Sequence, residues 1–173
     1  MNKNLIFEYF IFKSLLNLTR DSSEFKNDLS ILKSIKLLFF FSTISDSTHS
    51  PLIDEFETVK ALPLGHVITD IYASIKSDNL TFFSFNKNGV SLKSSSINET
   101  DFDINIRQAV DPRFDLLLKN NPYILKMTAY ELVELSHKWY SWNYYFNIAR
   151  SNGLSSIEIP IEVIKTERKI YSF

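Results

Sequence analysis

Three histidines are the side chains of this 173-residue chain best suited to acid–base or metal chemistry: His49, His66 and His137. They lie in distant segments and form neither an H-x-x-x-H nor an H-E-x-x-H pair, the spacings that bring two zinc ligands onto one helix face. His49 falls in a serine-rich stretch, where we expect a solvated loop residue. The sequence therefore predicts no metal site and no cofactor.

His137 has neighbours that could take part in acid–base catalysis. Glu134 lies three residues earlier, on the same face of a predicted helix, and a carboxylate in that position can orient an imidazole. His137 also lies near the end of this helix, beside Trp139 and Trp142, where an imidazole complements the negative end of the helix dipole. We favour this structural role, because no second catalytic group is fixed beside the histidine.

His66 and Asp70 are expected in the first turn of a third helix, which begins after the turn Pro63-Leu64-Gly65. Asp70 suits the positive end of the helix dipole, whereas a histidine there would be neutral. Both residues are therefore interpreted first as helix-start residues. A metal-independent hydrolase that uses His137 or His66 stays an alternative.

Composition excludes several kinds of site. Three glycines and no cysteine leave no dinucleotide or phosphate loop, no G-x-S-x-G elbow, and no cysteine-based zinc, cluster or disulfide chemistry. Lys+Arg 19 against Asp+Glu 20 gives a net charge of −1, so no basic field collects nucleic acid. The many Phe and Tyr residues suit a core, with some left for protein interfaces. We expect no enzyme activity and no nucleic-acid partner.

The apolar N-terminus, residues 1–18, resembles a signal peptide only superficially. Glu8, Lys13 and Asn17 interrupt it, and no small-residue cleavage site follows. The apolar stretch around Lys36 is likewise too short to cross a membrane. We therefore expect a cytoplasmic protein without membrane contact.

Helical periodicity places most of the first half of the chain. Apolar residues recur at steps of three and four over 5–16 and over 31–42, and the second segment is apolar nearly all round. Such a helix is central and buried. The third helix follows over 67–75, and the segment 56–62 before its entry turn is short and mixed, with an extended conformation possible.

Turn and capping residues indicate where elements begin and end in the second half of the chain. Asn88-Gly89 between two apolar runs predicts a β-hairpin over 81–92. Asp111-Pro112 predicts the start of a short helix, and the capping box Thr128–Glu131 predicts another. Ser141 is expected to cap the chain again for a further aromatic helix.

The C-terminal segment is ambiguous. Residues 157–163 alternate as a strand does, whereas Pro160 followed by apolar residues at helical spacing favours a helix from Ile161, the interpretation we adopt. With no repeat or linker visible, we predict one α+β domain that is predominantly helical. It is a compact helical bundle around a buried central helix, with a small antiparallel β-hairpin.

Two motifs in sequence order resemble a known family. Residues 61–72, A-L-P-L-G-H-V-I-T-D-I-Y, are similar to the A-x-P-x-G-P-V-x-x-D-x-Y signature of the Panacea domain, the SocA-like antitoxin and phage-associated family. Residues 132–138, followed by Trp142, resemble its second signature, L-x-x-L-[ST]-H with a Trp shortly after. The aromatic segment 37–41 and the closing segment 164–171 also resemble the family. The match covers about 31–171 of a single domain spanning 1–173, with 1–30 as an N-terminal helical extension.

One position departs from the family pattern. The family's Gly-Pro-Val is Gly65-His66-Val67 here, so the chain loses the φ angle that proline presets for a first helical position. A histidine in that place could instead point at a partner or at a carboxylate. The hairpin region also diverges, so no surface it contributes carries over.

The resemblance implies a bacterial toxin–antitoxin role without catalysis. It implies an antitoxin that neutralises a cognate, adjacently encoded toxin by direct protein–protein interaction. The alternative within the family is an adaptor that delivers a toxin or other client to an ATP-dependent protease. The motif residues and candidate partner contacts are Pro63, Gly65, His66, Asp70, Tyr72, Ser136, His137 and Trp142.

Overall fold

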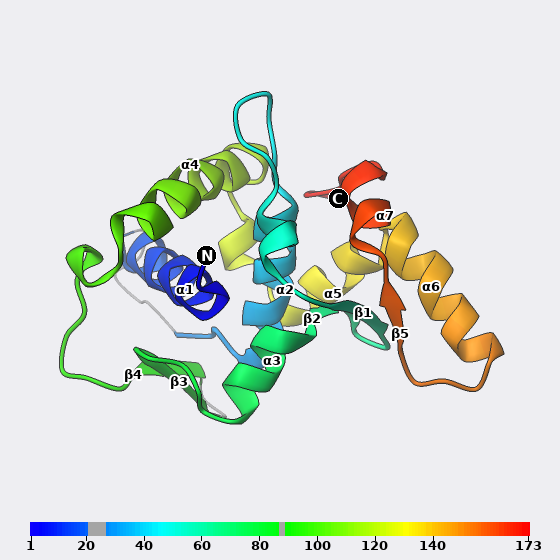
Figure 1. Cartoon of the computed structure of the whole chain (residues 1–173), viewed down its shortest axis with the longest axis horizontal. Coiled ribbons are helices and arrows are strands. Elements are labelled where there is room, and N and C mark those ends of the chain that lie inside the picture. The colour runs from blue at the N-terminus through cyan, green and yellow to red at the C-terminus, as the bar shows by residue number, and fades with distance from the viewer. Residues whose placement is uncertain (21–26, 87–88) are drawn as a thin grey trace.

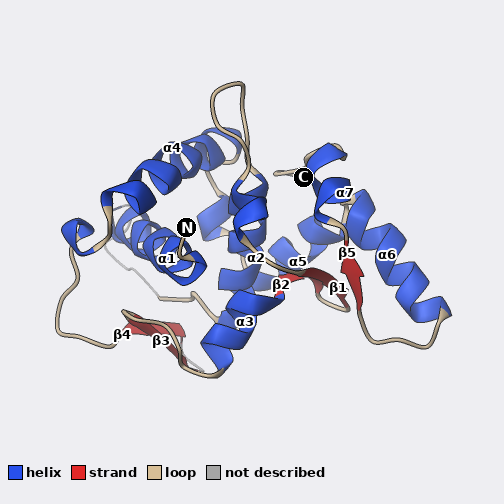
Figure 2. Ribbon diagram, viewed as in Figure 1, coloured by secondary structure: helices blue, strands red, loops and turns tan. Residues whose placement is uncertain are grey.

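The computed structural model describes residues 1–20, 27–86 and 89–173 (Figure 1). Within these residues the helices are α1 (Lys3–Arg20), α2 (Ile31–Thr43), α3 (Thr69–Lys76), α4 (Ile104–Asn120), α5 (Ala129–His137), α6 (Tyr140–Ser151) and α7 (Ile161–Thr166). The strands are β1 (Val59–Leu62), β2 (Gly65–Ile68), β3 (Phe83–Asn86), β4 (Gly89–Leu92) and β5 (Ile157–Ile159). Short 3-10 helices span Leu52–Glu55, Glu99–Asp101 and Ile124–Lys126. The fold is α+β and mostly helical, as predicted (Figure 2).

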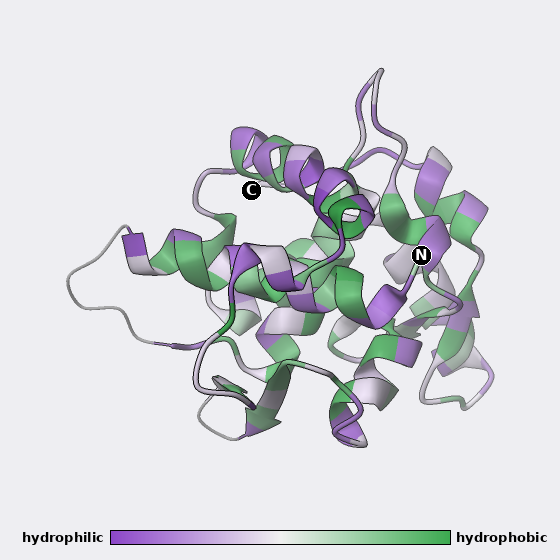
Figure 3. Cartoon of the chain, turned by 60° about the vertical axis from the view of Figure 1, so that its left-hand side comes forward, coloured by the Kyte–Doolittle hydropathy of each residue, from purple (hydrophilic) through white to green (hydrophobic). Residues whose placement is uncertain are grey.

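Helix α2 is the centre of the fold. Ser30 caps it by accepting a hydrogen bond from the Lys33 N–H at 3.3 Å, and every residue from Lys33 to Thr43 is buried. The helix contacts α1, α3, α4, α5 and β2, with α1 and α4 to its left and α5 and β2 to its right in Figure 1. Hydrophobic residues gather towards the middle of the molecule and hydrophilic ones on its outer turns (Figure 3). The predicted buried central helix is confirmed.

Helix α1 belongs to this core. Its Phe7 and Phe10 side chains are fully buried, and Phe10 stacks on Phe41 of α2 with ring centroids 4.5 Å apart. An amphipathic helix gains most of its stability from packing of this kind. The helix predicted over 5–16 is confirmed, and the N-terminal segment is an integral part of the helical bundle.

A three-stranded antiparallel sheet of order β2-β1-β5 joins distant parts of the chain. Ala61 of β1 lies opposite His66 of β2 and, on its other side, opposite Ile157 of β5. The predicted turn at residues 63–65 is present, but the prediction that a helix follows it directly, with His66 in the first helical turn, was wrong. Residues 65–68 form strand β2, and α3 begins only at Thr69. The residues of β2 find backbone partners on β1 and are buried on both faces, so they show no alternation that would mark them as a strand.

The second sheet is the predicted hairpin. Strands β3 and β4 pair with Phe83 opposite Leu92, and Asn88, the first turn residue of the prediction, lies outside the described residues. Glu8 attaches the hairpin to α1, because its carboxylate accepts hydrogen bonds from the backbone N–H groups of Phe82 at 2.6 Å and Phe83 at 3.1 Å.

The predicted helix start at Asp111-Pro112 was wrong. Helix α4 begins at Ile104, capped by Asp103, and Pro112 lies inside it. Proline removes one backbone donor and crowds the carbonyl four residues earlier, yet α4 continues past Pro112 to Asn120. The Asp111 carboxylate is used in tertiary structure instead, where it accepts from the Tyr9 hydroxyl at 3.0 Å.

The remaining predictions are decided in the C-terminal third. The capping box is confirmed: the Thr128 N–H donates to Glu131 Oε2 at 2.7 Å, and the Glu131 N–H donates to Thr128 Oγ1 at 3.2 Å. Ser141 is not a cap, since it lies in the first turn of α6 with its side chain buried. The helix from Ile161 is confirmed as α7, directly after strand β5. In the described part of the chain, no helix is both long and apolar enough to span a membrane.

Candidate functional site

The side chain of His66, in the first motif stretch, contacts Ser136 of the second stretch and is fully buried. Its Nδ1 lies 2.8 Å from Ser136 Oγ of α5, and its Nε2 lies 2.8 Å from Ser141 Oγ of α6. The ring stacks on Phe39 of α2, with centroids 3.9 Å apart and planes 7° from parallel. Strand β2 thus presents one imidazole to three helices at once. It points at two serines, not at a partner or directly at a carboxylate.

Hydrogen bonding around His66 fits a neutral imidazole. Ser136 Oγ accepts the His66 backbone N–H at 3.1 Å, and the Ser141 backbone N–H donates to Glu167 Oε2 at 2.9 Å. A serine hydroxyl can both donate and accept, so one serine can donate to the unprotonated ring nitrogen while the other accepts from the protonated one. Both ring nitrogens are then satisfied without a charge on the imidazole.

Electrostatics favour the same neutral state. Burial lowers the pKa of His66 well below its ordinary value, and the positive charges of Lys36 and His137 lower it further. Lys36, on α2, is itself fully buried, and its Nζ donates to the His66 carbonyl oxygen. Burial lowers the pKa of this ammonium to about 7. The network therefore contains two basic groups that this environment holds close to, or in, their uncharged forms.

Gly65 is the point of closest approach between β2 and α5. Its φ angle is +92°, in the region that favours glycine, and a Cβ there would lie 2.5 Å from Ser136 Oγ and 3.1 Å from Lys36 Nζ. Only a residue without a side chain lets the strand approach the serine closely enough for the His66 contacts.

His137 and Trp142 hold the turn between β1 and β2 from outside. Trp142 Nε1 donates to the Leu62 carbonyl oxygen at 2.8 Å, and the His137 ring stacks on Trp142 with centroids 3.7 Å apart. Burial lowers the pKa of His137, opposed by Glu134 and the backbone of Pro63. The predicted Glu134 partner lies 3.8 Å from Nδ1, which is an ion-pair distance but not a hydrogen bond.

The structure brings together most, but not all, of the residues singled out in the sequence. Gly65, His66 and Ser136 form one buried contact, and His137 and Trp142 adjoin it. Pro63 and Tyr72 lie at the surface nearby. Asp70 is separate, since it faces α1 and pairs with Lys3 at 3.0 Å.

Sequence reasoning missed Lys36, Phe39, Ser141 and Glu167 as members of the network. A lysine within an otherwise apolar helix was a usable signal for Lys36, because such a residue must find a buried partner. The position of Ser141 carried no comparable signal. Its serine is equally common at a helix start, and its real partners lie 75 and 26 residues away in sequence.

An apolar surface groove of about 430 Å³ is lined by residues that adjoin this network in the chain. We call it the α2–α3 groove. Its walls are the first two turns of α2 (Ile31, Leu32, Ile35), the turn Leu62–Leu64 with Val67, and the outer face of α3 (Tyr72, Lys76). Ile35 and Leu64 are chain neighbours of Lys36 and Gly65, so the buried network fixes two of the three walls.

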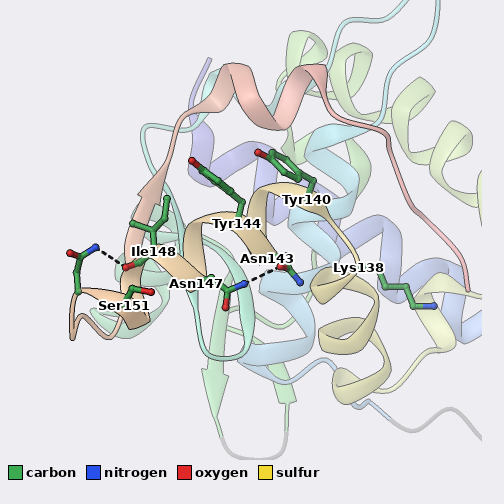
Figure 4. Close-up of a pocket in the computed structure, with 8 residues that line it drawn as sticks. Lys138, Tyr140, Asn143, Tyr144, Asn147, Ile148 and Ser151 are labelled. Carbon is green, nitrogen blue, oxygen red and sulfur yellow. Dashed lines mark hydrogen bonds between the residues drawn. The ribbon is translucent and has the colours of Figure 1, made fainter.

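A second hollow, of about 530 Å³, lies along the outside of α6 (Figure 4). Tyr140 and Tyr144 stack on each other there with centroids 5.4 Å apart, and the amides of Asn143 and Asn147 are hydrogen-bonded at 3.0 Å (Figure 4). All its lining residues come from 138–152. This second hollow is therefore lined by one face of α6 and the residues flanking that helix, whereas the α2–α3 groove is lined by three separate parts of the chain.

Two further findings concern known proteins and metal binding. Comparison of the chain with protein-family models, with curated proteins and with solved structures finds no match. Across residues 1–20, 27–86 and 89–173, no group of three or more His, Asp or Glu side chains is placed to hold a metal ion.

Proposed function

We propose that this chain is an antitoxin-like protein-binding module, which neutralises a cognate toxin in the cytoplasm by direct, non-catalytic interaction. One observation carries the proposal. The two stretches that resemble the Panacea motifs are separated by about sixty residues in sequence, yet they meet at His66–Ser136 and at Leu62–Trp142. Together they fix the exposed turn at Pro63–Leu64.

The division between buried and exposed motif residues supports this function. Gly65, His66 and Ser136 are buried, so in this fold they act by holding the turn in place. Leu64 and Tyr72 are 46% and 38% exposed and are free to contact another protein. A rigid surface of this kind loses little conformational entropy on binding, and a few apolar or aromatic anchors supply most of the affinity.

The burial of His66 weighs against the hydrolase alternative. Both of its ring nitrogens are hydrogen-bonded to serines, and the fully buried side chain leaves no room for a substrate beside them. A general base has to reach the proton that it abstracts. His137 is packed flat on Trp142 and is used in support of the turn.

Co-expression with the adjacent open reading frame tests the proposal. We expect the adjacent product to arrest growth when expressed alone, to be tolerated with this chain, and to copurify with it. His137→Gln should still neutralise the adjacent product, because it removes the imidazole that a hydrolase would need but leaves a side chain of similar size at this position. A harmless adjacent product, or growth arrest that this chain fails to relieve, would overturn the proposal. If relief instead requires an ATP-dependent protease and lowers the level of the adjacent product, the chain is the adaptor.

A further inference from the structure

We propose that the α2–α3 groove binds an apolar segment of the partner protein that carries an acidic side chain, with its carboxylate on Lys76. The inference rests on the proposed function and adds to it the surface that binds and the chemistry of the bound segment.

The groove has the shape and lining of a peptide site. Its volume of about 430 Å³ falls in the range of roughly 300–1,000 Å³ seen for ligand sites. Leu64 stands at its edge with 46% of its surface exposed, and the Ile31 and Leu32 side chains opposite are partly exposed. Apolar side chains on two helices and a turn match an apolar segment laid between them, as in helix-in-groove recognition.

The charge of the groove decides which apolar segment fits. Among the residues that the structure describes, Lys76 is the one charged residue that lines it. Its Nζ lies 5.7 Å from the centroid of the Tyr72 ring, and no carboxylate of the described residues lies within ion-pair distance of it. By contrast, Lys33 beside the groove is paired with Asp28 at 2.8 Å. The exposed ammonium at the groove edge is therefore available to an acidic partner.

The opposite wall has the same sign. Ile31 and Leu32 lie in the first turn of α2, which holds no acidic residue, and the N-terminal end of a helix carries partial positive charge. Asp28, just before this turn, is engaged by Lys33. The α2 wall and the α3 wall of the groove therefore both disfavour a basic segment and favour an acidic one.

The same charge disfavours a second copy of this chain as the occupant. In a twofold dimer the same patch faces itself, so the two Lys76 ammonium groups would lie in one interface without a carboxylate from the groove. A partner with Asp or Glu beside its apolar residues meets no such repulsion.

The test measures the affinity of the purified chain for the product of the adjacent open reading frame by isothermal titration calorimetry. Lys76→Glu and Leu64→Asp should each weaken binding by about tenfold or more. Matched controls are Lys119→Glu on α4 and Leu154→Asp after α6, both at exposed positions, which should change the affinity by less than about threefold. Melting temperatures of all four variants establish that each is folded, which we expect because the substituted side chains are exposed. If Leu64→Asp alone unfolds, Lys76→Glu decides.

Charge exchange then identifies the contact. Changing the partner's acidic residues to lysine, one at a time, should yield one variant that binds Lys76→Glu better than it binds the unaltered chain. The outcomes separate the two proposals. If the unaltered chain binds but both groove variants bind equally well, the groove inference is overturned and the proposed function stands. If the unaltered chain binds nothing, the proposed function fails and the inference with it. Self-association that Leu64→Asp abolishes, without loss of partner binding, would assign the groove to a second copy and also overturn the inference.

Discussion

Gly65 and Ser136 lie so close together that a Cβ on residue 65 would stand 2.5 Å from the serine Oγ. Real Cβ contacts are not found at that distance, and the backbone φ angle of +92° at Gly65 adds a second constraint. The same serine oxygen receives the backbone N–H of the next residue, His66, at 3.1 Å. The absence of one side chain therefore allows the contact that joins the two motif stretches.

Gly65→Ala should lower the free energy of unfolding by about 3 kcal/mol, because a left-handed backbone and an overpacked contact are forced together. Urea denaturation followed by circular dichroism measures this loss. Gly153→Ala is the matched control, since its φ is +68° but a Cβ there meets no atom within 4 Å. It should lose about 1 kcal/mol, from the backbone alone. Equal losses for the two variants would contradict the close-approach argument.

Lys36 should make stability rise with pH above neutrality. Burial lowers its folded-state pKa from 10.5 to about 7, so between these values the unfolded chain binds more protons than the folded one. The free energy of unfolding contributed by this group therefore increases as pH rises from about 7 to about 10.5. Lys36→Met should remove the increase, and the difference between the two proteins measured by denaturation at pH 7, 8, 9 and 10 isolates it. Parallel curves would show that Lys36 is not desolvated.

His66 should have the corresponding effect in acid. Its folded-state pKa is lowered well below 6.5, so stability from this group is complete above about pH 6.5 and falls as the pH drops, because the unfolded chain gains the proton first. His66→Gln should flatten the thermal-stability profile between about pH 6.5 and 5, leaving the smaller contribution of His137. A profile for His66→Gln as steep as that of the unaltered chain would refute the neutral imidazole.

The neutral state of the His66 imidazole has a direct spectroscopic test. Its Nδ1 and Nε2 lie 2.8 Å from the hydroxyls of Ser136 and Ser141, and burial lowers its pKa well below the ordinary value. Imidazole 15N chemical shifts should therefore show one protonated and one unprotonated nitrogen at pH 7. Ser136→Ala should disturb the Nδ1 resonance, and Ser141→Ala the Nε2 resonance. Two protonated nitrogens at pH 7 would contradict the neutral imidazole.

Trp142→Phe should loosen the turn that borders the groove. It keeps an aromatic ring for His137 to stack on but loses the Nε1–H hydrogen bond to the Leu62 carbonyl, which costs about 1 kcal/mol. Hydrogen exchange of the backbone amides of Leu64 and Gly65 should become faster than in the unaltered chain. Tyr144→Phe, on the exposed face of α6, should leave both quantities unchanged. Unaltered exchange in Trp142→Phe would mean that the turn is held by β1–β2 pairing alone.

Helices α1, α2 and α5 could be predicted from the sequence because their signals are local. The apolar spacing of α2 and the Thr128–Glu131 capping box involve residues three or four positions apart, and the structure confirms them. Strand β2 could not be predicted in this way. It is defined by backbone hydrogen bonds to β1 and, through β1, by β5 almost a hundred residues later. Before those partners are known, Val67 and Ile68 fit a buried helix face as well as a buried strand.

The sequence by itself determined the turn at Gly65 and the starts of α2, α5 and α7, because those depend on the intrinsic φ preferences and short-range hydrogen bonds of single residues. The starts of α3, α4 and α6 did not follow from such local signals. Gly65 belongs to this class as a turn residue. What Gly65 turns towards was decided only by the tertiary structure. The contacts of His66 with Ser136 and Ser141, and the α2–α3 groove lined by residues that adjoin this network in the chain, arise when α2, α5 and α6 close around β2. Burial and hydrogen bonding between segments seventy or more residues apart are collective properties of the packed core, and no local pattern encodes them.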